Sequence, residues 1–275
     1  MTDLAVIILV KNEALHIERC VTNVMLMKPK QVFVVDCFST DGTQEIATRC
    51  GATVVEHEWP RLYAKQFNWA LDNLPIKATW VLRLDADEYF LPETIEEVKS
   101  LLSVKNEGAV NGLPSDVTSL SLARAHTFCG KLIKWGGAND VVLARFFKYG
   151  IGRCQDRAMD EHIITSEGVD YRLHGKFIDD NLNSMAWWKE KHIGYAKREA
   201  VDALAGETFK TTKSMYYRCP PYFRAFAYFC YRYFIRLGFL DGYAGWQWNF
   251  WQGLWYRWTV DRRISEMKRK DSSKT

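Results

Sequence analysis

The sequence lacks the signatures of several common protein classes. None of its seven cysteines stands in a CxxC pair, the spacing of many zinc and dithiol redox sites, so we expect all of them to be reduced core residues in a cytosolic compartment. The net charge of +4 is too small for a dedicated nucleic-acid-binding surface, so no nucleic acid partner is expected. The apolar start of the chain lacks the basic region and cleavage site of a signal peptide, which argues against export.

Long apolar runs and common nucleotide motifs are also missing. The longest stretch without a charged residue, Gly242–Tyr256, is shorter than the roughly 18 to 20 residues that span a bilayer as a helix. The loop after the first apolar run reads VKNEALHIE, so it is neither the GxGxxG of a dinucleotide fold nor a P-loop. A phosphatase of the haloacid dehalogenase type would need a threonine two residues after its second aspartate, and the segment DADEY does not provide one.

Alternating apolar runs and helical patterns fill the first 92 residues. Strands are predicted at Leu4–Val10, Gln31–Asp36, Ala52–Glu56 and Thr79–Leu84, with helices at Glu13–Met27, Gly42–Arg49 and Phe67–Asn73. Such an order is typical of a parallel α/β sheet buried on both faces. Ligands bind at the carboxyl ends of the strands of such sheets, and Asp36 and Asp85 lie at two of these ends.

The pattern changes twice farther along the chain. From about Ser119 the segments SLSLARAHTF, NDVVLARFFKYG and VDYRLHGKFI predict strands of a more mixed sheet, followed by a charged helix over Asn183–Leu204. Beyond residue 214 the chain becomes unusually aromatic and then ends in a polar tail, which we expect to be frayed. We therefore predict a domain of residues 1–214, divided near residue 118, and a helical segment of residues 215–275.

The segment WVLRLDADEYFLPET places Asp85, Asp87 and Glu88 directly after a buried strand. Residues two apart on a strand share a face, so Asp85 and Asp87 can point to one place. Two carboxylates at one place indicate a divalent cation, Mg²⁺ or Mn²⁺, shared with a substrate diphosphate. The spacing fits equally well a solvated turn that caps a helix beginning near Pro92.

Four segments together resemble a known family. LAVIILVKNE, VVDCFSTDGTQEIA, AKQFNWAL and LRLDADEYF, over about residues 4 to 92, look like the nucleotide-sugar-binding half of inverting family-two glycosyltransferases. The similarity is greatest to bacterial enzymes that build lipopolysaccharide core, capsule or exopolysaccharide. It implies the GT-A nucleotide-diphospho-sugar transferase fold, a Rossmann-like mixed α/β sheet flanked by helices, here with a C-terminal aromatic helical appendage. Residues 1–118 would bind the donor and residues 119–214 the acceptor.

The resemblance also implies roles for individual residues. Residues at positions that bind the donor nucleotide are Glu13, Asp36, Lys65, Gln66, Asn68 and Asp85. Asp87, together with Asp85, would hold the divalent metal, Mn²⁺ or Mg²⁺. Lys65 could offset diphosphate charge, or could be an ordinary solvated helix lysine. Cys37 stands where many relatives have Asp, Ser or Gly, so a side-chain oxygen contact at that position is in doubt.

Inverting transfer needs a carboxylate that removes the acceptor hydroxyl proton. The segment RAMDEHI resembles the family's acidic motif, so Glu161 is the first candidate for this base and Asp160 the second; the alternative is a simple pair of acids at a helix start. His162 is a weaker candidate, for orienting the base or contacting phosphate. Asp180, in the segment FIDDN, either lines the site or caps the following helix, a role that we assign first to Asn181 and Asn183.

The aromatic segment suggests a membrane surface. A helix over YFRAFAYFCYRYFIR would place Arg224, Arg232 and Arg236 on one arc and aromatic rings elsewhere. That arrangement suits a bilayer interface, where guanidinium groups meet anionic lipid. Ordinary helical packing and oligomerisation of the chain with itself are the alternatives. An enzyme docked peripherally on the inner face of the cell membrane, from the cytoplasm, would act on a lipid-linked glycan acceptor.

Three functions follow for further testing. The first is metal-dependent inverting transfer of a sugar from a nucleotide-diphosphate donor to a lipid-linked glycan in bacterial surface-polysaccharide synthesis. The second transfers the sugar to polyprenyl phosphate itself. The third is a non-catalytic protein that binds nucleotide sugar or glycan and recruits partners to a membrane; the intact acidic residues argue against it. Which nucleotide, sugar and linkage are used depends on pocket shape, which the sequence does not give.

Overall fold

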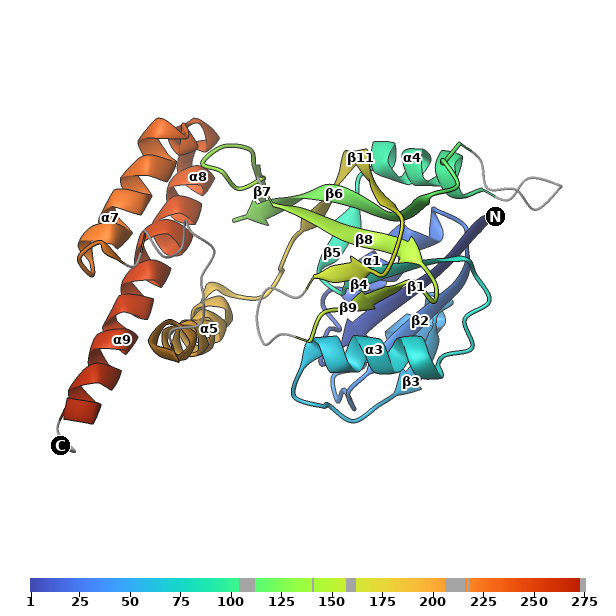
Figure 1. Cartoon of the computed structure of the whole chain (residues 1–275), viewed down its shortest axis with the longest axis horizontal. Coiled ribbons are helices and arrows are strands. Elements are labelled where there is room, and N and C mark those ends of the chain that lie inside the picture. The colour runs from blue at the N-terminus through green and yellow to red at the C-terminus, as the bar shows by residue number, and fades with distance from the viewer. Residues whose placement is uncertain (104–111, 140, 157–161, 206–215, 217, 273–275) are drawn as a thin grey trace. The chain divides into compact units, whose positions relative to one another are not determined.

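The computed structural model describes residues 1–103, 112–139, 141–156, 162–205, 216 and 218–272 (Figure 1). Its internal contacts divide the chain into two compact units. The first unit comprises Met1–His126 and Asp140–Leu182, and the second comprises Thr127–Asn139 and Asn183–Thr275. The domain boundary predicted near residue 214 lies outside the described residues and stays a prediction.

The first unit is built on a mixed sheet whose strand order is β3-β2-β1-β4-β8-β6-β11-β5. The parallel half consists of β1 (Thr2–Val10), β2 (Pro29–Asp36), β3 (Thr53–Glu56) and β4 (Trp80–Asp85). These strands confirm the four apolar runs that predicted them, within a few residues at each end. All nine residues of β1 are buried, as expected for a central strand covered on both faces.

The other half of the sheet is mixed. It consists of β8 (Val142–Lys148), β6 (Val117–Phe128), β11 (Val169–Asp179) and the short β5 (Glu88–Phe90), with β7 (Lys131–Ile133) paired to β6. Strand β11 runs parallel to β6 and antiparallel to β5. A separate hairpin pairs β9 (Gly152–Cys154) with β10 (Ile163–Thr165). Because Glu88 pairs with Asp179, the acidic turn lies beside the end of β11.

Helices cover both faces of this sheet (Figure 1). They are α1 (Ile17–Met25), α2 (Thr43–Arg49), α3 (Tyr63–Asn73) and α4 (Pro92–Leu102). Side chains of β1 alternate between two cores: Val6 and Ile8 pack in the cluster that includes α1 and α4, whereas Ile7 and Leu9 pack in the cluster that includes α3. This alternation fixes the register of β1, and with it the position of the loops that follow the strands.

The second unit is helical and aromatic. Its helical segments are α5 (Met185–Ala205), α7 (Phe223–Cys230), η1 (Tyr231–Ile235), η2 (Gly238–Asp241), α8 (Gly242–Trp248), η3 (Asn249–Trp255) and α9 (Tyr256–Ser272). The fold class expected from the sequence, a mixed α/β sheet flanked by helices with an aromatic helical appendage, is confirmed. The expectation of a frayed polar tail is wrong as far as Ser272, where α9 ends. The expectation that all cysteines lie in the core is also wrong, because Cys129 and Cys219 are exposed.

Helix α9 is held by partners that are distant in sequence. Asp261 is 1% exposed and its carboxylate accepts the Nε–H of Arg224 at 2.8 Å. Tyr256 and Arg257 donate to Glu199 of α5, each at 2.7 Å. The bond to Arg224 pairs a buried charge that would otherwise be costly, and together these bonds hold the first part of α9.

Candidate active site

The turn between β4 and β5 divides its three acidic residues between two roles. Glu88 is 2% exposed, and its carboxylate accepts the backbone N–H of Asp85 at 3.0 Å and a hydrogen bond from Arg145 of β8. Burial raises the pKa of Glu88 well above its usual value, while the charge of Arg145 acts in the opposite sense. The side chains of Asp85 and Asp87 remain partly exposed. Glu88 therefore shapes the turn, and Asp85 and Asp87 face outward.

Asp85 and Asp87 are the residues available for a divalent cation. Within the described residues, no group of three or more His, Cys, Asp or Glu side chains could hold a metal ion. The Asp85 side chain is 41% exposed and lies 3.7 Å from a guanidinium nitrogen of Arg145. Magnesium typically binds through one or two carboxylates and completes its coordination with waters and substrate phosphates. The two carboxylates thus fit an ion shared with a diphosphate, and not an ion enclosed by protein.

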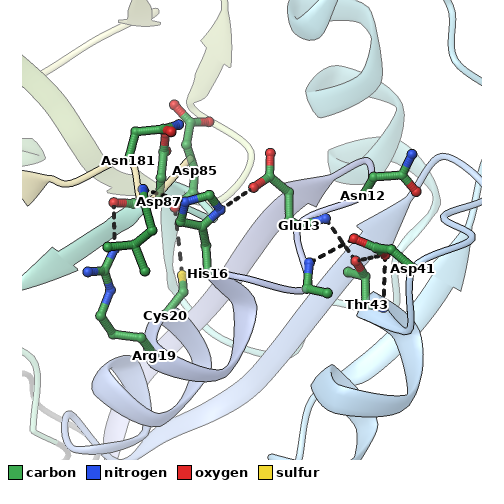
Figure 2. A network of polar contacts seen from close by, with 12 residues as sticks. Asn12, Glu13, His16, Arg19, Cys20, Asp41, Thr43, Asp85, Asp87 and Asn181 are labelled. Atoms are coloured by element: carbon green, nitrogen blue, oxygen red, sulfur yellow. Dashed lines mark hydrogen bonds and ion pairs between the residues drawn. The ribbon is translucent and has the colours of Figure 1, made fainter. Parts of the chain in front are cut away.

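The residues after β11 contact this turn (Figure 2). Asn181 donates its amide to Oδ2 of Asp87 at 3.0 Å, and the Asp180 backbone N–H donates to the Asp87 carbonyl at 3.0 Å. The Asp180 carboxylate forms an ion pair with Arg19 of α1. Asn181 was predicted to cap α5; in the structure, Ser184 Oγ accepts the N–H of Trp187 at the start of that helix.

The loops after β1 and β2 form the other side of the site. Asp36 is fully buried, and its carboxylate accepts the backbone N–H of Ser39 at 2.7 Å, the Ser39 hydroxyl, and the amide of Gln44 at 2.6 Å. Three of the roughly four acceptor positions of this carboxylate are therefore in use. Asp36 organises the loop after β2, and its predicted contact with the nucleotide stays a prediction.

Glu13 links the same loops to α1. Its backbone N–H donates to the Thr43 hydroxyl at 2.8 Å, and its carboxylate lies 2.6 Å from Nδ1 of His16 (Figure 2). Asp41 accepts the Thr43 hydroxyl and the Ala14 backbone N–H. Because of these bonds, the two loops at the carboxyl ends of β1 and β2 form one connected surface. Sequence reasoning missed His16 and Arg19. The available signal was that His16 follows Glu13, and Arg19 follows His16, by three residues, a spacing at which neighbouring side chains on a helix can interact.

The three donor-site candidates of α3 differ in exposure. Lys65 is exposed. Gln66 is fully buried, with its Oε1 2.8 Å from Nδ1 of His57 and its amide 3.1 Å from the Cys37 sulfur. Asn68 makes two hydrogen bonds, of 2.9 and 3.0 Å, with the backbone of Cys154 at the end of β9. Gln66 and Asn68 thus hold neighbouring segments in place, and Lys65 is the residue with a solvent-facing charge.

The predicted bases, Asp160 and Glu161, lie outside the described residues. Among the residues that flank them, the Gln155 N–H donates to the His162 carbonyl at 2.8 Å, directly after β9 and before β10. His162 itself is exposed. Since Asn68 fixes the end of β9, the connection that includes the predicted bases begins and ends beside α3.

The arginines of the aromatic segment do not form the expected exposed face. Arg224 and Arg232 are 5% and 8% exposed; Arg224 pairs with Asp261, and Arg232 donates to the Gly136 carbonyl at 2.7 Å. The prediction that Arg224 and Arg232 meet lipid is therefore wrong. The third arginine, Arg236, is partly exposed, and its contact with lipid stays a prediction. The exposed large apolar and aromatic residues between positions 223 and 246 are Phe223, Phe226, Tyr231, Phe234, Ile235, Leu237, Phe239, Leu240, Tyr243 and Trp246. Among the described residues, no helix has both the length and the apolar character needed to cross a bilayer.

Comparison with known proteins shows a family similarity over the first part of the chain. The family model described as "Glycosyl transferase family 2" matches residues 5–118, which include β1 to β4 and the acidic turn. An uncharacterized glycosyltransferase of Rickettsia bellii is 37% identical over 100 residues, covering 36% of this chain and 33% of that protein. A second one, from Rickettsia felis, is 34% identical over 107 residues, covering 39% and 36%. The chain spans about a third of the length of the curated relatives it matches.

Solved structures provide a more distant likeness. Glucosyl-3-phosphoglycerate synthase from Mycobacterium tuberculosis, crystallised with Mg²⁺ and uridine diphosphate, is 18% identical, with a TM-score of 0.35 over 45% of this chain and 44% of that chain. Mannosyl-3-phosphoglycerate synthase from Rubrobacter xylanophilus is 20% identical, with a TM-score of 0.35 over 45% and 40%.

Proposed function

We propose that the chain, whose residues 5–118 match the glycosyl transferase family 2 model, transfers a sugar from a nucleotide-diphosphate donor to an acceptor hydroxyl with inversion at the anomeric carbon. The observation that carries the proposal is the pair of outward-facing carboxylates, Asp85 and Asp87, at the carboxyl end of β4. Ligands of α/β sheets bind at such strand ends. The loops that carry Glu13 and Asp36 end the neighbouring strands β1 and β2.

The proposed reaction assigns one task to each group. Asp87, with Asp85, would hold Mn²⁺ or Mg²⁺ against the donor diphosphate, and the bound ion would supply neutralisation of the leaving-group charge. Lys65 would add a positive charge near the diphosphate. Glu161 or Asp160 would take the proton of the acceptor hydroxyl while that oxygen attacks the anomeric carbon. The bond from that carbon to the diphosphate breaks, and the electron pair leaves with the nucleoside diphosphate.

Thermal stabilisation of the purified protein tests the donor site. A ligand that binds only the native state raises the free energy of unfolding, by about 2.7 kcal/mol at a hundred times its dissociation constant. We expect either UDP or GDP, but not both equally, to raise Tm, and to do so only with Mn²⁺ or Mg²⁺ present. If neither nucleotide changes Tm with or without metal, the acidic turn is a solvated turn and the proposed donor site is wrong.

We propose further that the acceptor is a lipid-linked glycan in bacterial surface-polysaccharide synthesis, reached from the inner face of the membrane. The exposed apolar side chains between Phe223 and Trp246 support this proposal, because contiguous exposed apolar surface marks interaction sites. Asp241 is the only acidic residue between residues 218 and 258, and it is 3% exposed with its carboxylate accepting two backbone N–H groups. This stretch therefore presents no carboxylate that would repel an anionic bilayer.

Vesicle flotation tests the membrane proposal. Phe234 and Ile235 are 56% and 71% exposed, so changing both to Ser should weaken binding to phosphatidylethanolamine–phosphatidylglycerol vesicles by more than about tenfold, since burying each side chain is worth about 1.5 to 3 kcal/mol. Because Arg224 and Arg232 are buried, their guanidinium groups should not contribute to any salt dependence of binding. Leu26→Ser, at a 58% exposed position of the first unit, serves as the control.

Two results would count against a lipid surface. Equal flotation of the double variant and wild type would remove the role of Phe234 and Ile235. A concentration-dependent dimer that the double variant abolishes, without any flotation of wild type, would instead assign the surface to self-association.

Labelled product from polyprenyl phosphate alone would favour a polyprenyl-phosphate sugar synthase over transfer to a lipid-linked glycan.

A further inference from the structure

Three consecutive residues after β11 are each held by a different part of the donor half. Asp180 pairs with Arg19, Asn181 donates to Asp87, and the Leu182 N–H donates to Nε2 of His16 at 2.9 Å. We call residues 180–182 the clamped segment. These residues lie about 160 positions from α1 in the sequence, so the contacts are long-range and are not a by-product of local turn geometry.

His16 is the centre of this arrangement (Figure 2). It is 1% exposed, and its two ring nitrogens contact different residues: Nδ1 lies 2.6 Å from the Glu13 carboxylate and Nε2 accepts from Leu182. Since Nε2 accepts a backbone N–H, the ring proton of the neutral form lies on Nδ1 and is donated to Glu13. His16 thus joins a predicted nucleotide contact to the clamped segment.

Arg19, one turn later on α1, joins the clamped segment to the acidic turn. Its guanidinium donates to the Asp180 carboxylate, to the Asp180 carbonyl at 2.6 Å and to the Asp87 carbonyl at 3.4 Å. The plane of the guanidinium lies over Tyr89, 4.8 Å from the ring centroid. A planar group with several donors can hold three acceptors in fixed directions, which a lysine cannot.

We propose that the clamped segment and its holders, His16 and Arg19, are positioning elements of the donor site. The Asn181 amide fixes the orientation of the Asp87 carboxylate, and His16 fixes that of Glu13, so one segment sets both the metal side and the nucleotide side. This inference rests on the proposed function. It predicts that Asn181, His16 and Arg19 affect donor affinity although they do not contact the reacting atoms. Groups that orient metal ligands typically contribute 10- to 100-fold to metal affinity or activity.

Substitutions at Asn181 and His16 remove contacts of the clamped segment one at a time. Asn181→Leu keeps the side-chain size and removes the donor to Asp87, so the affinity for Mn²⁺ with UDP or GDP should fall about 10- to 100-fold. His16→Asn retains an amide near the position of Nδ1 for Glu13 but leaves nothing to accept from Leu182. His16→Gln places its amide oxygen near the position of Nε2, so it should keep the Leu182 bond. We therefore expect His16→Asn to lose affinity for nucleotide with Mn²⁺, and His16→Gln to recover it.

The measurements are thermal titrations of the full chain with Mn²⁺ plus UDP and with Mn²⁺ plus GDP, together with amide hydrogen exchange at Leu182. Exchange at Leu182 should be slow in wild type and His16→Gln and fast in His16→Asn. The control, Glu18→Gln, changes an exposed residue of the same helix and should titrate like wild type. If His16→Asn does not fold, Asn181→Leu and His16→Gln still test the proposal.

The outcomes distinguish this inference from the function on which it rests. If wild type binds a nucleotide with Mn²⁺, and Asn181→Leu and His16→Asn bind it with unchanged affinity, the positioning role alone is overturned. Wild type that binds neither nucleotide overturns the proposed function, and the positioning role with it. A loss of affinity in both variants, with rescue by His16→Gln, supports the inference.

Discussion

Asp87→Asn should reduce sugar transfer by about a thousandfold while leaving the protein folded. Charge stabilisation by a bound metal ion contributes several kcal/mol to such reactions, and each 1.36 kcal/mol is a factor of ten in rate. The carboxamide is nearly the same size as the carboxylate, and its oxygen can still accept the Asn181 amide that now donates to Oδ2. The measurement is release of nucleoside diphosphate from the donor sugar, together with Tm in the presence and absence of Mn²⁺.

Asp72→Asn is the matched control for this substitution. Asp72 is an α3 carboxylate that is 54% exposed and forms a surface ion pair with Arg153 at 2.8 Å. Exposed pairs of this kind contribute little to stability, so neither Tm nor turnover should change appreciably. Transfer that survives in Asp87→Asn at the wild-type rate would show that Asp87 does not hold a catalytic ion. A large fall in Tm without ligand would indicate a structural role instead.

The sheet and the position of the acidic turn could be predicted from the sequence because both depend on local patterns. A run such as LAVIILV can be buried on both faces only as a central strand, and the turn after WVLRL must then lie at the edge where ligands bind. Which of the three acids faces inward could not be predicted. Glu88 turns inward because β5 pairs with β11 and Arg145 lies on β8, and both partners are far away in the sequence.

The orientation of the aromatic segment shows the same limit. The helical spacing places Arg224 and Arg232 on one side, but it does not say whether that side faces solvent or protein. An arginine can be buried only with partners, and these come from residues distant in sequence: Asp261 for Arg224 and the Gly136 carbonyl for Arg232. With Arg224 and Arg232 inside, aromatic rings of the same segment are exposed, so a membrane contact would involve apolar side chains.

Glu161→Gln should lower turnover by about 10²- to 10⁴-fold, the usual contribution of a positioned general base. Donor binding should survive, because the base acts on the acceptor hydroxyl and not on the nucleotide. Asp160→Asn, made separately, should leave most of the activity if Glu161 is the base. The measurements are the rate of transfer at saturating donor and the Tm shift given by the nucleotide with Mn²⁺ for each variant.

Asp156→Asn provides the control within the same connection between β9 and β10. Asp156 is an exposed acid directly after Gln155, whose N–H donates to the His162 carbonyl, so its substitution removes a nearby negative charge without removing the predicted base. A pattern in which only Glu161→Gln loses turnover assigns the base, and the reverse pattern assigns it to Asp160. If both variants keep wild-type turnover, the proton is removed by another group. If either loses the nucleotide-dependent Tm shift, that residue belongs to the donor site, because a base that acts only on the acceptor cannot change nucleotide affinity in the absence of acceptor.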